Sequence, residues 1–170
     1  MQPNIDFLIL YTEITMAFIA FATIVATLRQ SFGKRLTPLQ NLLFHFFVEV
    51  GFLLLLNAII PIALLSIWPD RVEVWLLSTY AILLTVGLYL PFYIRRRRKI
   101  DAPVPPLSRL VMVGYGVVII MMILTATPWF WPPSLATTTY FLLWGLISNI
   151  AIFVYFIGTF VETDPADPNV

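Results

Sequence analysis

The sequence predicts an all-α membrane protein, folded as a bundle of five transmembrane helices. Of its 170 residues, 60% are hydrophobic and only 11% are charged, whereas soluble domains carry about 25% charged residues. Five segments are long and apolar enough to cross a bilayer, which takes a helix of about 20 residues. The Lys and Arg residues also gather in alternate loops. These three observations make the lipid bilayer the solvent of the chain.

The first two predicted helices cover residues 5–28 and 41–68. No Lys or Arg precedes the first of them, whereas a secretory signal peptide has a basic segment before its apolar core. We therefore expect this helix to stay in the membrane. The connecting segment RQSFGKRLTPLQ contains Gly33, Pro38 and three cations, and the second helix ends at the polar turn WPDRVE.

The remaining helices are predicted at residues 74–94, 110–127 and 140–161. The third helix runs into RRRRKIDAPVPPLSR, whose prolines cannot continue a helix. The fourth is the shortest and ends at the proline-rich, uncharged segment TPWFWPPS. The chain is thus predicted to consist of a transmembrane domain, residues 1–161, and a short acidic tail, residues 162–170.

The distribution of positive charge predicts the orientation in the membrane. Nine of the ten Lys and Arg residues lie in the first and third loops, and only Arg71 lies in the other two. Cytoplasmic loops carry the excess of positive charge, so we expect the N-terminus outside and the acidic tail in the cytoplasm. Four tryptophans fall at the outer boundary, as in an aromatic belt: Trp68, Trp75, Trp129 and Trp131.

The basic run RRRRK lies directly at the cytoplasmic end of the third predicted helix. Such a run is a topology signal and contacts anionic lipid headgroups, so we expect no nucleic-acid partner. The acidic tail lies on the same side and is a second candidate partner for these cations, the alternative being a solvated tail. The residues predicted to contact headgroups or tail are Arg95, Arg96, Arg97, Arg98 and Lys99.

Few ionisable side chains lie deep inside the predicted spans, and each needs an explanation. A charged side chain at the bilayer centre costs about 2.5–3.5 kcal/mol and therefore usually faces protein or water. His45 and Glu49 are four residues apart and share one helix face. Glu13 lies on a stripe with Ala17 and Ala20. Small residues mark close helix contacts in membranes, so we expect Glu13 to point at protein.

Folding the first two helices into an antiparallel hairpin brings residues level whose numbers sum to about 69. The carboxyl groups of Glu13 and Glu49 are then about 10 Å apart along the helix axis, which is too far for one shared metal ion. Pro61 frees the backbone carbonyl of Asn57, and Asn149 lies near mid-membrane in the fifth helix.

Two interpretations of these polar residues stay open. In the first they line a hydrated cavity or an ion path. In the second they hydrogen-bond the helices together, typically for about 0.6 kcal/mol each, and have no transport role. The residues of the predicted ion path or polar cluster are Glu13, His45, Glu49, Asn57 and Asn149.

The residue content argues against most cofactors and against an enzyme. The absence of cysteine excludes disulfides, thiolate metal sites and iron–sulfur clusters. No lysine in a span can form a retinal Schiff base, and the single histidine cannot supply a bis-histidine haem, although a haem at a subunit interface stays possible. No phosphate-binding glycine loop or GxSxG elbow occurs. We predict no metal or cofactor, and we attribute the GYG sequence at 114–116 to close helix packing.

Two stretches carry a resemblance to other proteins: TEITMAFIAFATIVATLRQ and LTPLQNLLFHFFVEVGFLLLLNAIIPIAL. They resemble the first two helices of a group of small uncharacterised bacterial integral membrane proteins. The resemblance implies a multi-pass protein of the bacterial inner (cytoplasmic) membrane and makes Glu13 a feature of the group. It implies no activity, and the His45–Glu49 pair has no counterpart in it.

The sequence thus leads to two functional hypotheses of different classes. The first is an oligomeric channel or proton- or ion-conducting protein, with Glu13 and Glu49 lining the path and His45 as a neighbour that titrates. Five helices enclose little space, so such a path needs several copies. The second is a non-catalytic accessory or scaffold subunit of a larger membrane complex. A membrane enzyme or cofactor carrier is a third, weaker alternative.

Overall fold

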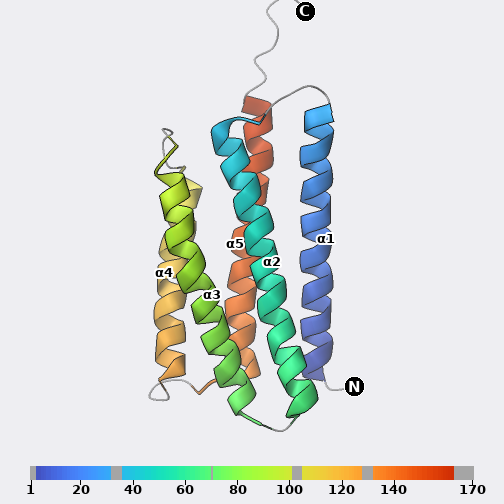
Figure 1. Cartoon of the computed structure of the whole chain (residues 1–170), viewed down its shortest axis with the longest axis vertical. Coiled ribbons are helices and arrows are strands. Elements are labelled where there is room, and N and C mark those ends of the chain that lie inside the picture. The colour runs from blue at the N-terminus through green and yellow to red at the C-terminus, as the bar shows by residue number, and fades with distance from the viewer. Residues whose placement is uncertain (1–2, 32–35, 70, 101–104, 128–131, 163–170) are drawn as a thin grey trace, which may run out of the picture.

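The computed structural model describes residues 3–31, 36–69, 71–100, 105–127 and 132–162. These residues form five long helices and no strand, so the predicted all-α architecture is confirmed (Figure 1). All five helices are long and apolar enough to cross a membrane. They are α1 (Pro3–Ser31), α2 (Pro38–Ile67), α3 (Glu73–Arg97), α4 (Pro106–Ala126) and α5 (Leu135–Glu162).

Several helices extend beyond the predicted spans because polar and proline residues stabilise their ends. α2 begins with a capping box, in which the Thr37 hydroxyl accepts from the Gln40 backbone N–H and the Gln40 side chain accepts from the Thr37 N–H. This arrangement satisfies two backbone donors that a helix start otherwise leaves unpaired. α4 begins at Pro106, in the first turn, where proline is well tolerated. A search for apolar runs does not detect such ends.

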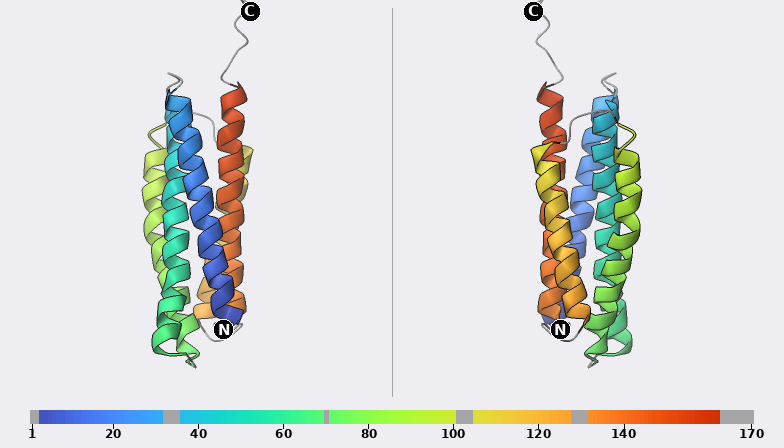
Figure 2. Two further views of the ribbon diagram at one scale, coloured as in Figure 1. Left: turned by 90° about the vertical axis from the view of Figure 1, so that its right-hand side faces the viewer. Right: turned by 90° about the vertical axis from the view of Figure 1, so that its left-hand side faces the viewer.

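The helices pack side by side, with α2 in a central position. α2 contacts α1, α3 and α5, and α4 contacts α3 and α5. α1 and α4 lie at opposite edges of the bundle, as the two side views in Figure 2 show. Phe46 of α2 packs against Tyr93 of α3 with ring centroids 4.7 Å apart, and Phe47 packs against Phe153 of α5 at 4.8 Å.

The register of the α1–α2 hairpin agrees with the sequence-based expectation. α1 approaches α2 closely at Gly51, where a Cβ atom would lie 2.7 Å from Cγ1 of Ile19. These residue numbers sum to 70, close to the expected value. Glycine permits this approach, and a larger residue would push the helices apart.

The two glycines of the GYG sequence have different surroundings. The ring of Trp144 from α5 packs directly on Gly114, in the volume that a Cβ atom would occupy. Gly116 has nothing within 4 Å of the corresponding position. Close helix packing therefore explains Gly114 and does not explain Gly116.

Candidate functional site

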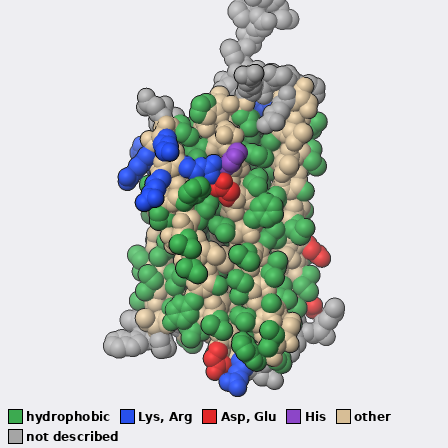
Figure 3. Space-filling view, in the orientation of Figure 1, with side chains coloured by type: hydrophobic (Ala, Val, Ile, Leu, Met, Phe, Trp, Pro, Cys, Tyr) green, Lys and Arg blue, Asp and Glu red, His purple; other side chains and the backbone are tan. Residues whose placement is uncertain are grey.

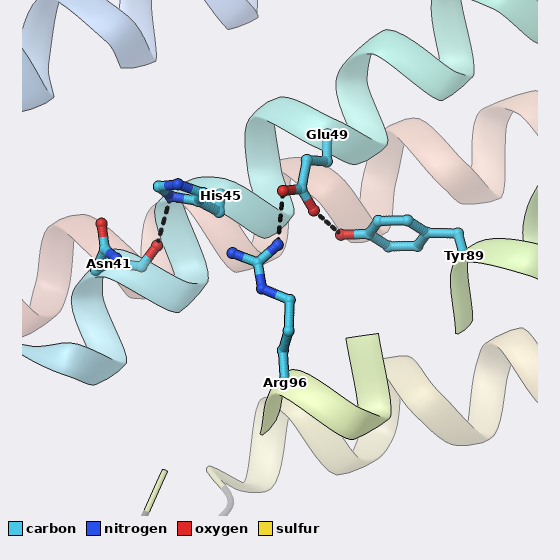
Figure 4. Close-up of polar contacts among 5 residues, drawn as sticks. All are labelled: Asn41, His45, Glu49, Tyr89 and Arg96. Carbon is cyan, nitrogen blue, oxygen red and sulfur yellow. Dashed lines mark hydrogen bonds and ion pairs between the residues drawn. The ribbon is translucent and has the colours of Figure 1, made fainter. Parts of the chain in front are cut away.

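Both oxygens of the Glu49 carboxylate are engaged by side chains of α3 (Figure 4). Nη1 of Arg96 lies 2.6 Å from Oε1, and the hydroxyl of Tyr89 donates to Oε2 at 3.0 Å. The carboxylate thus accepts one charge-assisted and one neutral hydrogen bond. We call Glu49, Arg96 and Tyr89 the Glu49 cluster. It joins α2 to α3, and its ion pair is partly exposed, with exposed side-chain fractions of 33% for Glu49 and 29% for Arg96.

Helix geometry explains how Arg96 reaches Glu49. Arg96 is seven residues after Tyr89, which corresponds to about 10 Å along α3. Its side chain bends back along the helix, with the guanidinium 5.4 Å from the centre of the Phe92 ring, in cation–π range. The guanidinium therefore turns from the end of the helix towards Glu49.

His45 occupies the same face of α2 as Glu49 but has a different partner. Its Nδ1 lies 3.1 Å from the backbone carbonyl oxygen of Asn41, one turn earlier. Because a carbonyl only accepts, Nδ1 carries the proton of this bond, and Nε2 is left for another partner. The ring of Phe44 packs edge-on against the imidazole at 6.0 Å. The structure places His45 beside the Glu49 cluster without a direct bond to the carboxylate.

Asn57 and Asn149 each tie α2 to another helix. The Asn57 amide donates to the hydroxyl of Thr85 in α3 at 2.9 Å. The Asn149 amide of α5 donates to the backbone carbonyl of Phe47 at 3.2 Å. Asn149 is only 2% exposed, and its Oδ1 has no partner among the described residues. Both asparagines therefore bond α2 to a neighbouring helix.

Glu13 is exposed on the outer surface of α1. Within one copy it does not point at protein, which differs from the expectation drawn from Ala17 and Ala20. Those two alanines are exposed as well, because α1 turns the opposite face, with Tyr11 and Thr15, to the bundle. One copy of the described chain thus does not join the five predicted residues into a single cluster.

Several neutral side chains also form interhelical hydrogen bonds, which the sequence-based prediction of ionisable residues does not include. The hydroxyl of Tyr11 in α1 donates to the backbone carbonyl of Leu142 in α5 at 2.9 Å. Ser148 of α5 bonds the hydroxyl of Tyr115 in α4 at 3.0 Å. The amide of Gln40 donates to both oxygens of Thr159 at 3.2 Å. Hydroxyl and amide side chains inside apolar spans are the signal that identifies such positions.

A small cavity lies between α2, α3, α4 and α5. Its volume is about 50 Å³, which accommodates a few water molecules. Most of the lining is apolar, and the polar groups at its wall belong to Asn57, Tyr89 and Tyr115. Of the five residues of the predicted ion path or polar cluster, Asn57 lines this cavity and the other four do not.

The basic residues after the third span lie at one end of the bundle (Figure 3). Arg95, Arg98 and Lys99 are exposed, and Nη1 of Arg97 donates to the backbone carbonyl of Ile100 at 2.9 Å. Arg96 differs from its neighbours through its contact with Glu49. Residues 163–170 and the side chain of Glu162 lie outside the described residues, and so does the predicted contact of the tail with the basic run.

No group of three or more His, Asp or Glu side chains within the described ranges is placed to hold a metal ion. The chain matches no known protein-family model, no curated protein and no solved structure.

Proposed function

We propose that the protein is a non-catalytic assembly subunit of the bacterial inner membrane, which associates with further copies of itself through the Glu13 face of α1. The observation that carries the proposal is the contrast between Glu13 and the other polar side chains. Glu49, Asn57 and Asn149 are bonded between helices of one copy. Glu13 points outwards and has no hydrogen bond among the described residues.

The position of Glu13 makes an outward orientation unfavourable in lipid alone. It lies eight residues from Ile5, the start of the apolar span, which corresponds to a depth of about 12 Å. A carboxyl group at this depth is stabilised by a hydrogen-bond donor from another helix. Ala17 and Ala20 on the same face allow that helix to approach closely.

A second copy offers such a donor on the opposite edge of the bundle. A shallow depression there is lined by side chains of α4 and α5, namely Val118, Met121, Thr125, Thr137, Tyr140 and Phe141. Tyr140 is 65% exposed. The hydrogen bond between Tyr11 and Leu142 places these two residues at about the same height in the bundle. Tyr140 comes two residues before Leu142, and Glu13 comes two residues after Tyr11. Because α1 and α5 run in the same direction, Tyr140 and Glu13 differ in height by about 6 Å. The two side chains can span this distance.

A contact between opposite edges is heterologous, so it joins copies in a ring or a row. The α1 face of one copy would pack against the α4–α5 depression of the next. Ion conduction, the first hypothesis from the sequence, stays a prediction. Both oxygens of the Glu49 carboxylate are bonded to side chains of α3, which favours the accessory or scaffold hypothesis.

Disulfide crosslinking tests the proposed contact directly, because the chain contains no cysteine. Leu10 lies one turn before Glu13 and Met121 lines the depression, and both are exposed. The variant Leu10→Cys/Met121→Cys is expected to form a ladder of disulfide-linked oligomers in membranes. The matched control Leu10→Cys/Leu84→Cys places the second thiol on an exposed site of α3 and should give no ladder. The same yield from both pairs would refute the contact.

The mass of the detergent-solubilised protein tests the role of Glu13. The wild type is expected to be oligomeric by light scattering. Glu13→Gln keeps a hydrogen-bonding group and should stay associated. Glu13→Leu removes it and should shift the protein towards monomers. A wild type that is monomeric in mild detergent and gives no crosslinks would contradict the proposal.

We also propose the orientation that the positive charges predict, with the N-terminus outside and the C-terminus in the cytoplasm. Ser31 and Val72 are exposed residues at opposite ends of the bundle. A cysteine at Ser31 should react with a membrane-impermeant reagent only after the membrane is opened, because it lies on the cytoplasmic side. A cysteine at Val72 should react in intact cells. The reverse pattern would invert the orientation.

A further inference from the structure

Arg96 and His45 present hydrogen-bonding groups that the Glu49 cluster does not use. A guanidinium has five N–H donors. One nitrogen of Arg96 contacts Glu49, and no other acceptor in the described part of the chain bonds the group. Nε2 of His45 is likewise not used by the bond to Asn41. In Figure 4 the guanidinium lies between Glu49 and His45, with its second amino group turned to the histidine side.

The surroundings of these two side chains favour an anion. Arg95, Arg98 and Lys99 are exposed at the same helix end. Figure 3 shows Lys and Arg side chains gathered beside the histidine on this face. Glu49 offsets one positive charge of this group, so an excess of positive charge remains.

The depth of the site is close to the boundary between the hydrocarbon core and the lipid headgroups. α2 has 30 residues and is about 45 Å long, whereas the hydrocarbon core is about 30 Å thick. The helix therefore extends about 7 Å beyond the core at each end if it is centred. His45 is seven residues, or about 10 Å, from the start of α2. It thus lies close to the boundary at which lipid headgroups begin.

We propose that Arg96 and His45 bind the phosphate group of an anionic phospholipid headgroup. Arg96 donates to two phosphate oxygens from its fork of N–H groups, and Nε2 of His45 donates when the ring carries both protons. Glu49 and Tyr89 act as positioning residues, because they hold the guanidinium on the histidine side of α3. The site does not depend on self-association through α1.

Binding of short-chain lipids to the purified full chain in a neutral detergent tests this site. Phosphatidylglycerol and phosphatidylcholine carry the same phosphate diester, but choline adds a cation, which is repelled by Arg95, Arg98 and Lys99. Calorimetry is expected to show phosphatidylglycerol binding about tenfold tighter than phosphatidylcholine. Arg96→Lys keeps a cation for Glu49 and loses the fork, and His45→Leu removes the second donor, because a leucine side chain has no N–H group. Each should lower phosphatidylglycerol affinity about tenfold.

Arg109→Lys is the matched control, because it makes the same change at an exposed arginine of α4 outside the site and should leave the affinity within about twofold. Equal losses from Arg96→Lys and Arg109→Lys, or no loss from any variant, would show diffuse attraction and overturn the site. Thermal unfolding verifies that each variant is folded. If Arg96→Lys does not fold, the affinity of His45→Leu decides the test. Inorganic phosphate should fail to displace the lipid. Displacement that depends on His45 and Arg96 would overturn the assignment to a lipid and identify free phosphate as the ligand.

Discussion

Gly114→Ala is expected to lower the free energy of unfolding by about 2 kcal/mol, because the added methyl group overlaps the Trp144 ring. The ring packs between α4 and α5, and its Nε1 is buried without a hydrogen-bond partner among the described residues. The ring has to move, and the two helices have to separate slightly. Unfolding by dodecyl sulfate in mixed micelles, followed by tryptophan fluorescence, measures the loss.

Gly116→Ala is the matched control, since this glycine is two residues away on the same helix and has open space around it. Its stability should be unchanged or rise by at most about 1 kcal/mol through the higher helix propensity of alanine. In a Trp144→Leu background, Gly114→Ala should cost less, because the smaller side chain leaves room for the methyl group. Equal effects at positions 114 and 116 would contradict the packing explanation.

Glu49→Leu is expected to destabilise the bundle by about 1–2 kcal/mol, because Arg96 and Tyr89 both lose their acceptor. The partial exposure of the ion pair keeps the loss below that of a buried pair. Glu49→Gln retains hydrogen-bonding capacity and should cost less. A double-mutant cycle with Arg96→Gln should give a coupling energy of at least about 0.5 kcal/mol.

A surface ion pair provides the control for Glu49. Nη1 of Arg71 lies 3.7 Å from Oε1 of Glu73, with most of both side chains exposed. This pair lies at the end of the bundle opposite Arg95–Lys99. Glu73→Leu should therefore not change stability measurably. The same proteins in liposomes test ion conduction, because a path through Glu49 predicts that Glu49→Gln lowers flux without loss of fold. If Glu49 only joins helices, Glu49→Gln should leave flux unaffected.

The helices and their number could be predicted because the bilayer imposes one dominant constraint on sequence. A span requires a long apolar run, and the run is visible without knowledge of the packing. The helix ends depend on local contacts instead. The capping box of Thr37 and Gln40 and the first-turn position of Pro106 add residues that are not apolar.

Arg96 belongs to the basic run in sequence, and its pairing with Glu49 becomes visible only when α2 and α3 are aligned as an antiparallel hairpin. Their connection is centred near residue 70, so level residues have numbers that sum to about 140. Glu49 is then level with a residue near 91, within reach of both Tyr89 and Arg96. The same sum places Asn57 near residue 83, close to its partner Thr85.

The outward position of Glu13 could not be predicted from α1 alone. Its helix carries Tyr11 and Thr15 on one side and Ala17 and Ala20 on the other, and both sides are compatible with helix contacts. The side that faces the bundle makes contacts to distant parts of the chain, such as the hydrogen bond from the Tyr11 hydroxyl to Leu142 of α5, 131 residues away in sequence. A contact at such separation has no local signal.

Three polar groups of the first two helices have their partners in α5, which is synthesised well after them. Tyr11 bonds Leu142, Gln40 bonds Thr159, and the Phe47 carbonyl accepts from Asn149. A nascent chain therefore inserts α1 and α2 well before α5 emerges from the ribosome. During that interval the α1–α2 hairpin exposes the Tyr11 hydroxyl, the Gln40 amide and the Phe47 carbonyl to lipid or to an insertion factor. We therefore expect a delay in the folding of this protein, which ends when α5 enters the membrane and pairs these groups.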